Sequence, residues 1–450
     1  MFLPVHFRQR PILYGSFRRQ RMVDHQSRQL RFQDRRATIA TAQPLRERRA
    51  SKAGGGKPAA RRVRVAAEGI YRVSSGMGMR SAWRRGLCGL ALAAIALAPP
   101  ACSETAQRES GAVLQRWTIS GETMGTTFAV TVVSIPGAGE AHARPEASAR
   151  ALVPADRQID RSAVAAEVRR VLERIEGRMS HYRPESELSR FNRARTTEPQ
   201  RMSPETLGVV AEALAVSRAS GGAFDVTVGP LAEAWGFGPG GRALAAPDRL
   251  VLAELRARVG AGLLEPDLVA GTLRKRRPDL VVDLSAIAKG YAVDAISALL
   301  DEIGFEDHLV EIGGELRGAG TNEEGTPWRV AIERPVSGAP AAQPILPLTD
   351  AALATSGDYC NFYDLDGARV SHTIDPRTGR PVTHGLLSVS VVAERCALAD
   401  ARSTALNVLG PEEGHALAVE QGWAALFVED DGAGGLVERE TPAFTAAVGR

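Results

Sequence analysis

The chain has 450 residues, of which 44% are hydrophobic, so it is long enough to bury a large core. Its charge is unevenly distributed, because residues 1–80 contain 19 Lys and Arg against 4 Asp and Glu although the whole chain carries a net charge of only +4. Residues 81–450 are therefore net acidic. No nucleic-acid partner is expected for them, since such a partner requires a basic surface.

The basic segment at residues 1–78 precedes a sequence with the features of an export signal. Arg80, Arg84 and Arg85 are followed by the apolar run Gly86–Ala98 and then by Cys102. This run is too short to cross a hydrocarbon core of ~30 Å and is typical of a signal peptide. Residues 79–102 are thus predicted to direct export, either as a lipoprotein-type signal with Cys102 acylated or as a signal cleaved by ordinary signal peptidase.

The expected location follows from this signal. The protein is predicted to be exported, either as a lipoprotein at the periplasmic face of the inner membrane or as a periplasmic protein. Residues 1–78 are interpreted as sequence upstream of the true start codon or as a disordered basic tail, residues 103–115 as a tether and residues 116–450 as the main folded domain. Cys360 and Cys396 remain in that domain and could pair in an oxidising compartment, but sequence alone does not give their separation.

The domain shows irregularly alternating strand and helix patterns. β-Branched residues predict strand structure over Trp117–Ser134, and Gly137–Arg157 has the composition of a surface loop. Apolar spacing and end signals predict three helices, at Ser162–Met179, Pro204–Ser220 and Ala288–Gly304. Further strands are expected at Leu280–Asp283, His308–Ile312, Trp328–Glu333, Leu387–Val392 and Ala424–Glu429. This order favours an α+β fold with mixed or antiparallel sheets and packed helices.

Two polar segments in the middle of the domain are candidates for ligand binding. In Gly221–Leu231, paired glycines would let the backbone approach a ligand, and Phe224 could supply a ring contact. In Val281–Tyr291, a helix beginning near Ile287 would offer free N–H groups to phosphate oxygens. Both segments are also compatible with a loop and a helix start that carry no ligand.

Two later segments add a histidine and a possible metal pair. His372 lies between two hydroxyl residues, two positions after Val370, and is either a general base or a hydrogen-bonded residue at the end of a strand. Asp400 and Thr404 are four residues apart and would share one face of a helix. Two oxygen ligands with waters and phosphates suit Mg²⁺ rather than zinc. Taken alone, however, this spacing is common in ordinary helices.

In their order along the chain, these segments resemble the ApbE family of FAD:protein FMN transferases, whose domain is related to the T-fold. The resemblance extends from Trp117 to about residue 430. It rests on six blocks at residues 124–128, 182–192, 222–231, 282–291, 371–379 and 399–405.

The resemblance implies a site for FAD as substrate and for Mg²⁺. The residues expected to hold FAD are Met124, Tyr182, Ala223, Phe224, Asp225, Asp283, Lys289 and Ile374. Mg²⁺ would be bound by the Ala286 carbonyl, Asp400 and Thr404, and His372 matches the active-site histidine. Some family members carry Asp where this chain has Ser403, which reduces the number of anionic ligands available.

The implied reaction is transfer of FMN from FAD to a Thr or Ser hydroxyl of an acceptor protein, with release of AMP. The expected acceptors are exported or membrane-bound respiratory flavoprotein subunits. Two alternatives use the same FAD site: a Mg²⁺-dependent FAD pyrophosphatase, in which water replaces the protein hydroxyl, and a flavin-binding lipoprotein without catalytic activity.

Overall fold

The computed structural model describes residues 114–134, 160–238, 241, 243, 245–332, 345–357, 362–365, 367–432 and 435–449. The predicted basic segment, export signal, residues 103–113 of the tether and the loop at Gly137–Arg157 lie outside these residues, as do Cys102 and Cys360. Cys396 is a free, buried cysteine.

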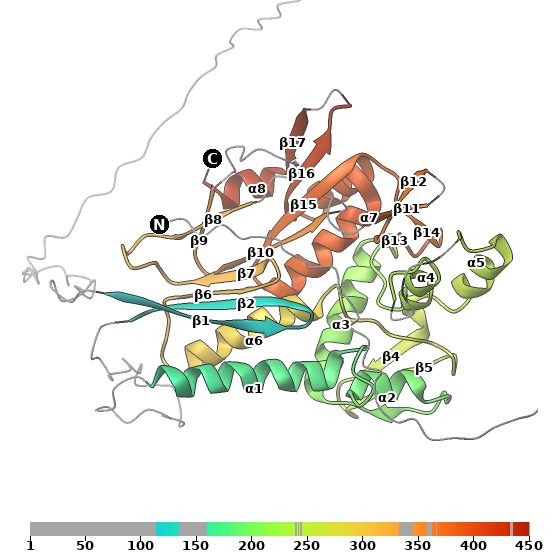
Figure 1. Cartoon of the computed structure of the whole chain (residues 1–450), viewed down its shortest axis with the longest axis horizontal. Coiled ribbons are helices and arrows are strands. Elements are labelled where there is room, and N and C mark those ends of the chain that lie inside the picture. The colour runs from blue at the N-terminus through green and yellow to red at the C-terminus, as the bar shows by residue number, and fades with distance from the viewer. Residues whose placement is uncertain are drawn as a thin grey trace, which may run out of the picture. The chain divides into compact units, whose positions relative to one another are not determined.

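An antiparallel sheet of eight strands forms the centre of the described chain (Figure 1). Its order is β1-β2-β6-β7-β10-β15-β16-β17. The bounds are β1 (Gln115–Thr123), β2 (Thr126–Ser134), β6 (His308–Ile312), β7 (Glu315–Ala319), β10 (Ala351–Gly357), β15 (Leu386–Ala393), β16 (Ala424–Asp430) and β17 (Leu436–Glu440).

The first two strands form a hairpin. The stretch predicted as β structure from Trp117 to Ser134 is divided at Met124 and Gly125, which have φ of 49° and 75°. Positive φ at both central residues is the geometry of the two-residue turn that matches strand twist.

Helices cover one face of this sheet, and a second core lies on the other face. The helices α1 (Arg161–Met179), α6 (Ala288–Glu302) and α7 (Cys396–Glu420) form the covering layer. Neighbouring residues of β2 point to opposite faces, so Val132 packs with α1 and α6 while Val133 packs with α8 (Pro442–Ala447) and with the hairpin of β8 (Trp328–Ala331) and β9 (Ile345–Leu348).

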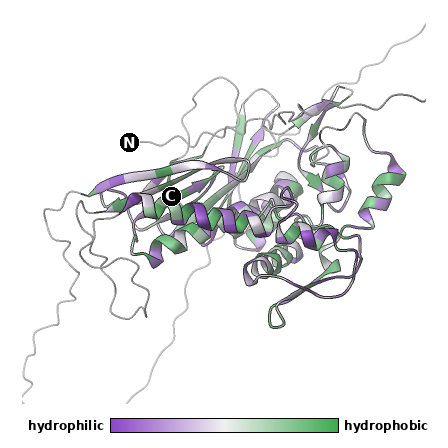
Figure 2. Cartoon of the chain, turned by 60° about the horizontal axis from the view of Figure 1, so that its bottom comes forward, coloured by the Kyte–Doolittle hydropathy of each residue, from purple (hydrophilic) through white to green (hydrophobic). Residues whose placement is uncertain are grey.

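Helix α1 of the covering layer is amphipathic, as the sequence periodicity requires. Figure 2, which brings the lower side of Figure 1 forward, shows helices of the chain that carry both hydrophobic and hydrophilic residues. In α1, the residues Val164, Val168, Val171, Leu172 and Ile175 are buried at helical spacing. None of the helices in the described part of the chain is both long and apolar enough to cross a membrane.

The remaining elements lie outside the eight-stranded sheet and its covering helices. The helices are α2 (Glu187–Arg193), α3 (Pro204–Ala219), α4 (Gly229–Ala234), α5 (Arg249–Arg256) and the 3-10 turn η1 (Ala261–Leu263). The strands are β3 (Gln200–Arg201), β4 (Leu264–Asp267), β5 (Thr272–Lys275), β11 (Phe362–Leu365), β12 (Ala368–Ser371), β13 (Ile374–Asp375) and β14 (Arg380–Pro381).

The predicted α+β class and all three predicted helices are confirmed. So are the strands expected at His308–Ile312, Leu387–Val392 and Ala424–Glu429, and the described residues of the one expected from Trp328. The strand predicted at Leu280–Asp283 is wrong. Its backbone pairs with a side chain instead of another strand, because the Asn192 amide donates to the Val282 carbonyl and accepts from the Val282 N–H, both at 2.8 Å.

Helix α7 was not predicted at its full length. It contains a kink at Gly410, where φ is 77° and ψ is −175°. The following residue is Pro411, which cannot donate to the Asn407 carbonyl four residues earlier. The His384 Nε2 lies 2.7 Å from that carbonyl and donates to it in place of the missing backbone N–H.

Candidate active site

Helices α6 and α7 meet through two reciprocal contacts. Asp294 of α6 accepts hydrogen bonds from the N–H groups of Cys396 and Ala397, at 2.8 and 3.0 Å, and so caps the start of α7. Asp400 of α7 accepts in turn from the Gly290 N–H in the first turn of α6, through Oδ2 at 3.1 Å. A Cβ at Gly290 would collide with the Cys396 carbonyl, so glycine allows this close packing.

The predicted Asp400 and Thr404 therefore lie beside the chain segment that contains Ala286. The Asp400 side chain is only 4% exposed. Thr404 follows one turn later on α7, with its Oγ1 3.3 Å from the Ser356 Oγ of strand β10. The Gly290–Asp400 contact brings together the two segments in which the metal ligands were expected.

Lys289 and Glu315 complete a buried charged cluster with Asp400. The Lys289 Nζ lies 3.0 Å from Glu315 Oε1 and 3.7 Å from Asp400 Oδ2. Burial raises the pKa of Glu315 to about 8 and also raises the pKa of Asp400, in each case against the lowering effect of Lys289. Burial lowers the pKa of Lys289, but the two carboxylates outweigh this effect and raise it above its usual value. The Lys289 ammonium group thus lies between two buried carboxyl groups.

The donors present fit a magnesium ion. Asp400, Thr404 and a backbone carbonyl supply only oxygen atoms, as Mg²⁺ prefers. Both Asp400 contacts among the described residues use Oδ2, which leaves Oδ1 to a ligand. Ser403 is engaged elsewhere, because its hydroxyl donates to the Asp400 carbonyl at 2.9 Å and lies 2.8 Å from the Ser356 Oγ. Within the described ranges, no group of three or more His, Cys, Asp or Glu side chains is arranged to hold a metal.

A cavity of about 320 Å³ lies next to the Ala286 segment. Two residues expected to hold FAD, Tyr182 and Asp283, line it. Tyr182 comes from the loop after α1 and is 53% exposed, so its ring is available to a ligand. The other lining residues are His181, Pro184, Ser189, Asn192, Arg193, Gly229, Pro230, Ala232, Glu233, Phe237, Gly238, Val281 and Val282.

Asp283 is held in one orientation at the edge of this cavity. Its Oδ1 accepts from the Ser285 N–H at 2.9 Å and from the Ser285 hydroxyl at 2.6 Å. The His181 Nδ1 lies 3.1 Å from the same oxygen. Burial raises the pKa of Asp283, but the hydrogen bonds from His181 and Ser285 outweigh it and lower the pKa below its usual value. Asp283 is therefore an anionic acceptor at neutral pH.

The run Ala223, Phe224 and Asp225 lies deeper than a ligand-contacting loop. The side chains of Ala223 and Phe224 are 1% and 2% exposed. Asp225 accepts from the Thr227 N–H and hydroxyl at 2.8 and 2.6 Å and from the Ala261 N–H at 2.7 Å, and burial raises its pKa. The side chains of this run thus belong to the scaffold around the site.

The paired glycines before this run have a structural role. Gly221 and Gly222 have φ of 58° and 83°, and the Gly222 N–H donates to the Ser217 carbonyl at 2.8 Å. They therefore terminate α3 in the left-handed conformation that glycine favours.

Met124 is connected to the Tyr182 loop through Glu176. The Glu176 Oε1 accepts from the Met124 N–H at 3.0 Å, and Oε2 pairs with Arg183, the neighbour of Tyr182. The β1–β2 turn is thereby fixed beside the loop that lines the cavity.

His372 and Ile374 lie on the other side of this region. His372 follows strand β12, and its ring meets the edge of the Phe237 ring at 6.3 Å between centroids. Phe237 itself lines the cavity. The neighbouring Thr373 accepts from the Asn407 amide at 3.1 Å, which ties this segment to the helix that carries Asp400. Ile374 is buried beneath it and is 6% exposed.

Three residues of this region were not predicted as site residues. Asn192 positions the Val282 backbone, Glu315 pairs with Lys289, and His181 pairs with Asp283. His181 is the immediate neighbour of Tyr182 and Glu315 follows the pair Gly313-Gly314, but sequence spacing gives no sign of their partners.

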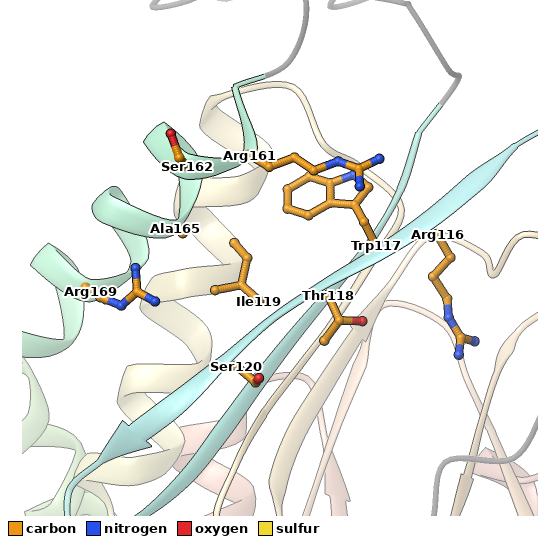
Figure 3. Close-up of a pocket in the computed structure, with 9 residues that line it drawn as sticks. All are labelled: Arg116, Trp117, Thr118, Ile119, Ser120, Arg161, Ser162, Ala165 and Arg169. Atoms are coloured by element: carbon orange, nitrogen blue, oxygen red, sulfur yellow. The ribbon is translucent and has the colours of Figure 1, made fainter.

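A more open hollow of about 550 Å³ lies between β1 and α1 (Figure 3). The Arg161 guanidinium lies over the Trp117 ring there, 5.4 Å from its centroid. The residues that line it are Arg116, Trp117, Thr118, Ile119, Ser120, Arg161, Ser162, Ala165 and Arg169. They include no carboxylate, no histidine and no predicted site residue, so the Tyr182 cavity is the candidate active site.

Comparison with known proteins agrees with this geometry. The sequence profile of the ApbE family matches residues 124–427. A Vibrio cholerae protein named FAD:protein FMN transferase is 42% identical over 316 residues, covering 70% of this chain and 88% of that protein. The protein of the same name from Escherichia coli K12 is 34% identical and covers 76% of this chain and 92% of its own length.

Solved structures give the same result for the fold. The Vibrio cholerae flavin transferase ApbE superposes with a TM-score of 0.65 at 39% identity, covering 74% of this chain and 99% of that one. Apo flavinyl transferase ApbE from Pseudomonas stutzeri gives 0.65 at 36% identity, covering 75% and 98%. On the combined strength of its sequence, fold and juxtaposed polar segments, this chain belongs to the ApbE family.

Proposed function

We propose that this chain transfers FMN from FAD to the hydroxyl of a Thr or Ser side chain in an acceptor protein, and that the reaction requires Mg²⁺. The observation that carries the proposal is the Gly290–Asp400 hydrogen bond at 3.1 Å. It places Asp400 and Thr404 beside the Ala286 segment, next to a cavity lined by Tyr182 and Asp283. The names of the relatives support the same activity.

In this proposal, the residues divide into ligands of the metal and ligands of FAD. The Ala286 carbonyl, Asp400 and Thr404 hold Mg²⁺, which when bound neutralises charge on the diphosphate. Lys289 adds a positive charge at the start of α6, where backbone N–H groups favour phosphate oxygens. Tyr182 and Asp283 hold the dinucleotide from the cavity side, together with Met124, Ile374 and the backbone of residues 223–225.

The bond changes balance without a further reactant. The acceptor hydroxyl oxygen bonds to the FMN phosphorus, the bond from that phosphorus to the bridging oxygen breaks, and AMP leaves with that oxygen. His372 accepts the hydroxyl proton. A side-chain hydroxyl is barely ionised at neutral pH. Proton transfer to His372 is therefore expected to raise the rate of transfer about 10²–10⁴-fold.

We further propose that the protein works outside the cytoplasm. The export signal at residues 79–102 would place it in the periplasm, and acylation of Cys102 would hold it at the inner membrane. The acceptors would then be exported or membrane-bound respiratory flavoprotein subunits.

The activity is tested by incubating the protein with FAD, Mg²⁺ and a purified acceptor protein. After denaturation, in-gel fluorescence should show flavin bound covalently to the acceptor. Free FMN and AMP without a fluorescent band would instead indicate hydrolysis.

Asp400→Asn tests the metal site in the same assay. The variant should lose transfer by about 10²-fold or more, because the anionic ligand is removed while the shape is kept. FAD binding, measured by flavin fluorescence, should weaken less. Unchanged transfer at limiting Mg²⁺ would remove Asp400 from the metal site.

A further inference from the structure

Three titratable side chains that line the cavity have no role in the proposed function, namely His181, Arg193 and Glu233, and His181 is the one that contacts both Tyr182 and Asp283. It lies in the loop between α1 and α2, and its side chain is 16% exposed. It contacts Tyr182 and Asp283, which are both proposed to hold FAD. These two residues are about 100 positions apart in the chain.

The first contact is with Asp283. The His181 Nδ1 lies 3.1 Å from Asp283 Oδ1 and 3.5 Å from the Ser285 Oγ. The Ser285 hydroxyl lies closer to the carboxylate, at 2.6 Å, and donates to it. Because a carboxylate only accepts, His181 carries a proton on Nδ1 and donates it to Asp283. This bond fixes the plane of the imidazole.

The second contact is with Tyr182. The two ring centroids are 3.9 Å apart, with an angle of 40° between the planes. Tyr182 is 53% exposed, and its ring lies against the oriented imidazole of His181. Asp283 therefore orients His181, and His181 orients Tyr182.

We propose that His181 is a positioning residue for FAD, which holds the Tyr182 ring at the cavity in the orientation that binds the dinucleotide. This inference rests on the proposed function, because it takes Tyr182 and Asp283 as FAD-contacting residues. Restricting an exposed ring before binding lowers the entropy lost on binding, so the effect belongs to FAD affinity and not to the chemical step.

Two variants separate the two contacts of His181. His181→Phe keeps a ring to stack on Tyr182 and loses the donor to Asp283. His181→Asn keeps a donor of similar reach and loses the ring. The matched control is His415→Asn, since the His415 ring also contacts an aromatic ring, meeting Phe427 edge to face at 5.6 Å between centroids, but lies outside the cavity.

The readouts are the Kd for FAD from flavin fluorescence without Mg²⁺ or acceptor, and KM and kcat for transfer. For His181→Asn we expect the Kd and KM for FAD to rise about tenfold, with kcat changed less than twofold. His181→Phe should recover most of this affinity through the retained ring, and His415→Asn should match wild type.

The inference is overturned if both His181 variants bind FAD within twofold of wild type, or if kcat falls while KM stays constant. If wild type binds FAD without transferring FMN, the proposed function fails while the Kd comparison still decides the role of His181. A wild-type protein that binds no FAD contradicts both.

Discussion

At the scale of single residues, the site depends on side chains whose charge is set by burial and by a few close partners. Asp400 has its Oδ2 bound by the protein and its Oδ1 left for a ligand. Asp283 stays anionic because His181 and Ser285 donate to it.

The i, i+4 spacing of Asp400 and Thr404 could be predicted from the sequence, since a helix alone brings them together. The pairing of Lys289 with Glu315 could not, because it depends on tertiary packing.

His372→Ala tests the general base. The variant should keep the FAD affinity and the Mg²⁺ dependence of FAD binding while kcat for transfer falls by about 10²–10⁴-fold. The His372 and Phe237 rings meet edge to face, with 6.3 Å between their centroids. Steady-state kinetics with FAD and acceptor measure the effect, and His372→Gln serves as a comparison that retains polarity. Full activity of the alanine variant would show that His372 is only a hydrogen-bonded residue at the end of β12.

At the scale of elements, the site is assembled where α6 and α7 cap each other. Asp294 satisfies the first N–H groups of α7, and Asp400 reaches back to the first turn of α6. The sequence predicted α6 within two residues at its end, because its apolar spacing and final glycine are clear. It did not predict the full α7, because Gly410 and Pro411 interrupt the helical pattern.

Gly410→Ala tests the kink in α7. Its backbone has φ of 77° and ψ of −175°, a region open essentially only to glycine, and a Cβ would lie 2.6 Å from His384 Cδ2. We expect a loss of about 2–3 kcal/mol in the free energy of unfolding, measured by urea denaturation. Gly422→Ala is the control, because Gly422 has φ of 66° but no atom within 4 Å of the added Cβ. If both variants lost the same free energy of unfolding, the contact between the added Cβ and His384 would not contribute to the destabilisation.

At the scale of the whole molecule, the eight-stranded sheet and its helical layer position the site. Alternation along β2 sends Val132 to the helical side and Val133 to the other core, as a period of two requires. This pattern allowed the α+β class to be predicted. The order of the strands could not be predicted, because the pairing of β2 with β6 joins residues about 180 positions apart. The extended segment at Leu280–Asp283 was mistaken for a strand for a similar reason, since its partner is the side chain of Asn192.

Global stability should depend on pH through His308, which is fully buried at the start of β6. Its Nδ1 donates to the Phe305 carbonyl at 2.8 Å, so the Ser297 hydroxyl donates to Nε2 at 2.7 Å and the ring is neutral. Burial lowers the pKa of His308 below the ordinary value of 6.5, despite the opposing hydrogen bond to Phe305 and the nearby Asp301.

The sign of the effect follows from this lowered pKa. As the pH falls through about 6.5, the unfolded chain binds a proton at His308 that the native state does not, so the free energy of unfolding decreases. The slope contributed by this residue is at most about 1.4 kcal/mol per pH unit. Urea denaturation at several pH values should show a smaller decrease for His308→Gln, and parallel curves for the variant and wild type would contradict the assignment.

The central claim is that the site transfers FMN to a protein instead of hydrolysing FAD. It is tested most directly by counting AMP released against FMN bound covalently to the acceptor, using intact-mass spectrometry of the acceptor after reaction with FAD and Mg²⁺. We expect one FMN added to the acceptor for each AMP released, with both products lost in Asp400→Asn. Release of AMP while the mass of the acceptor stays unchanged would contradict it.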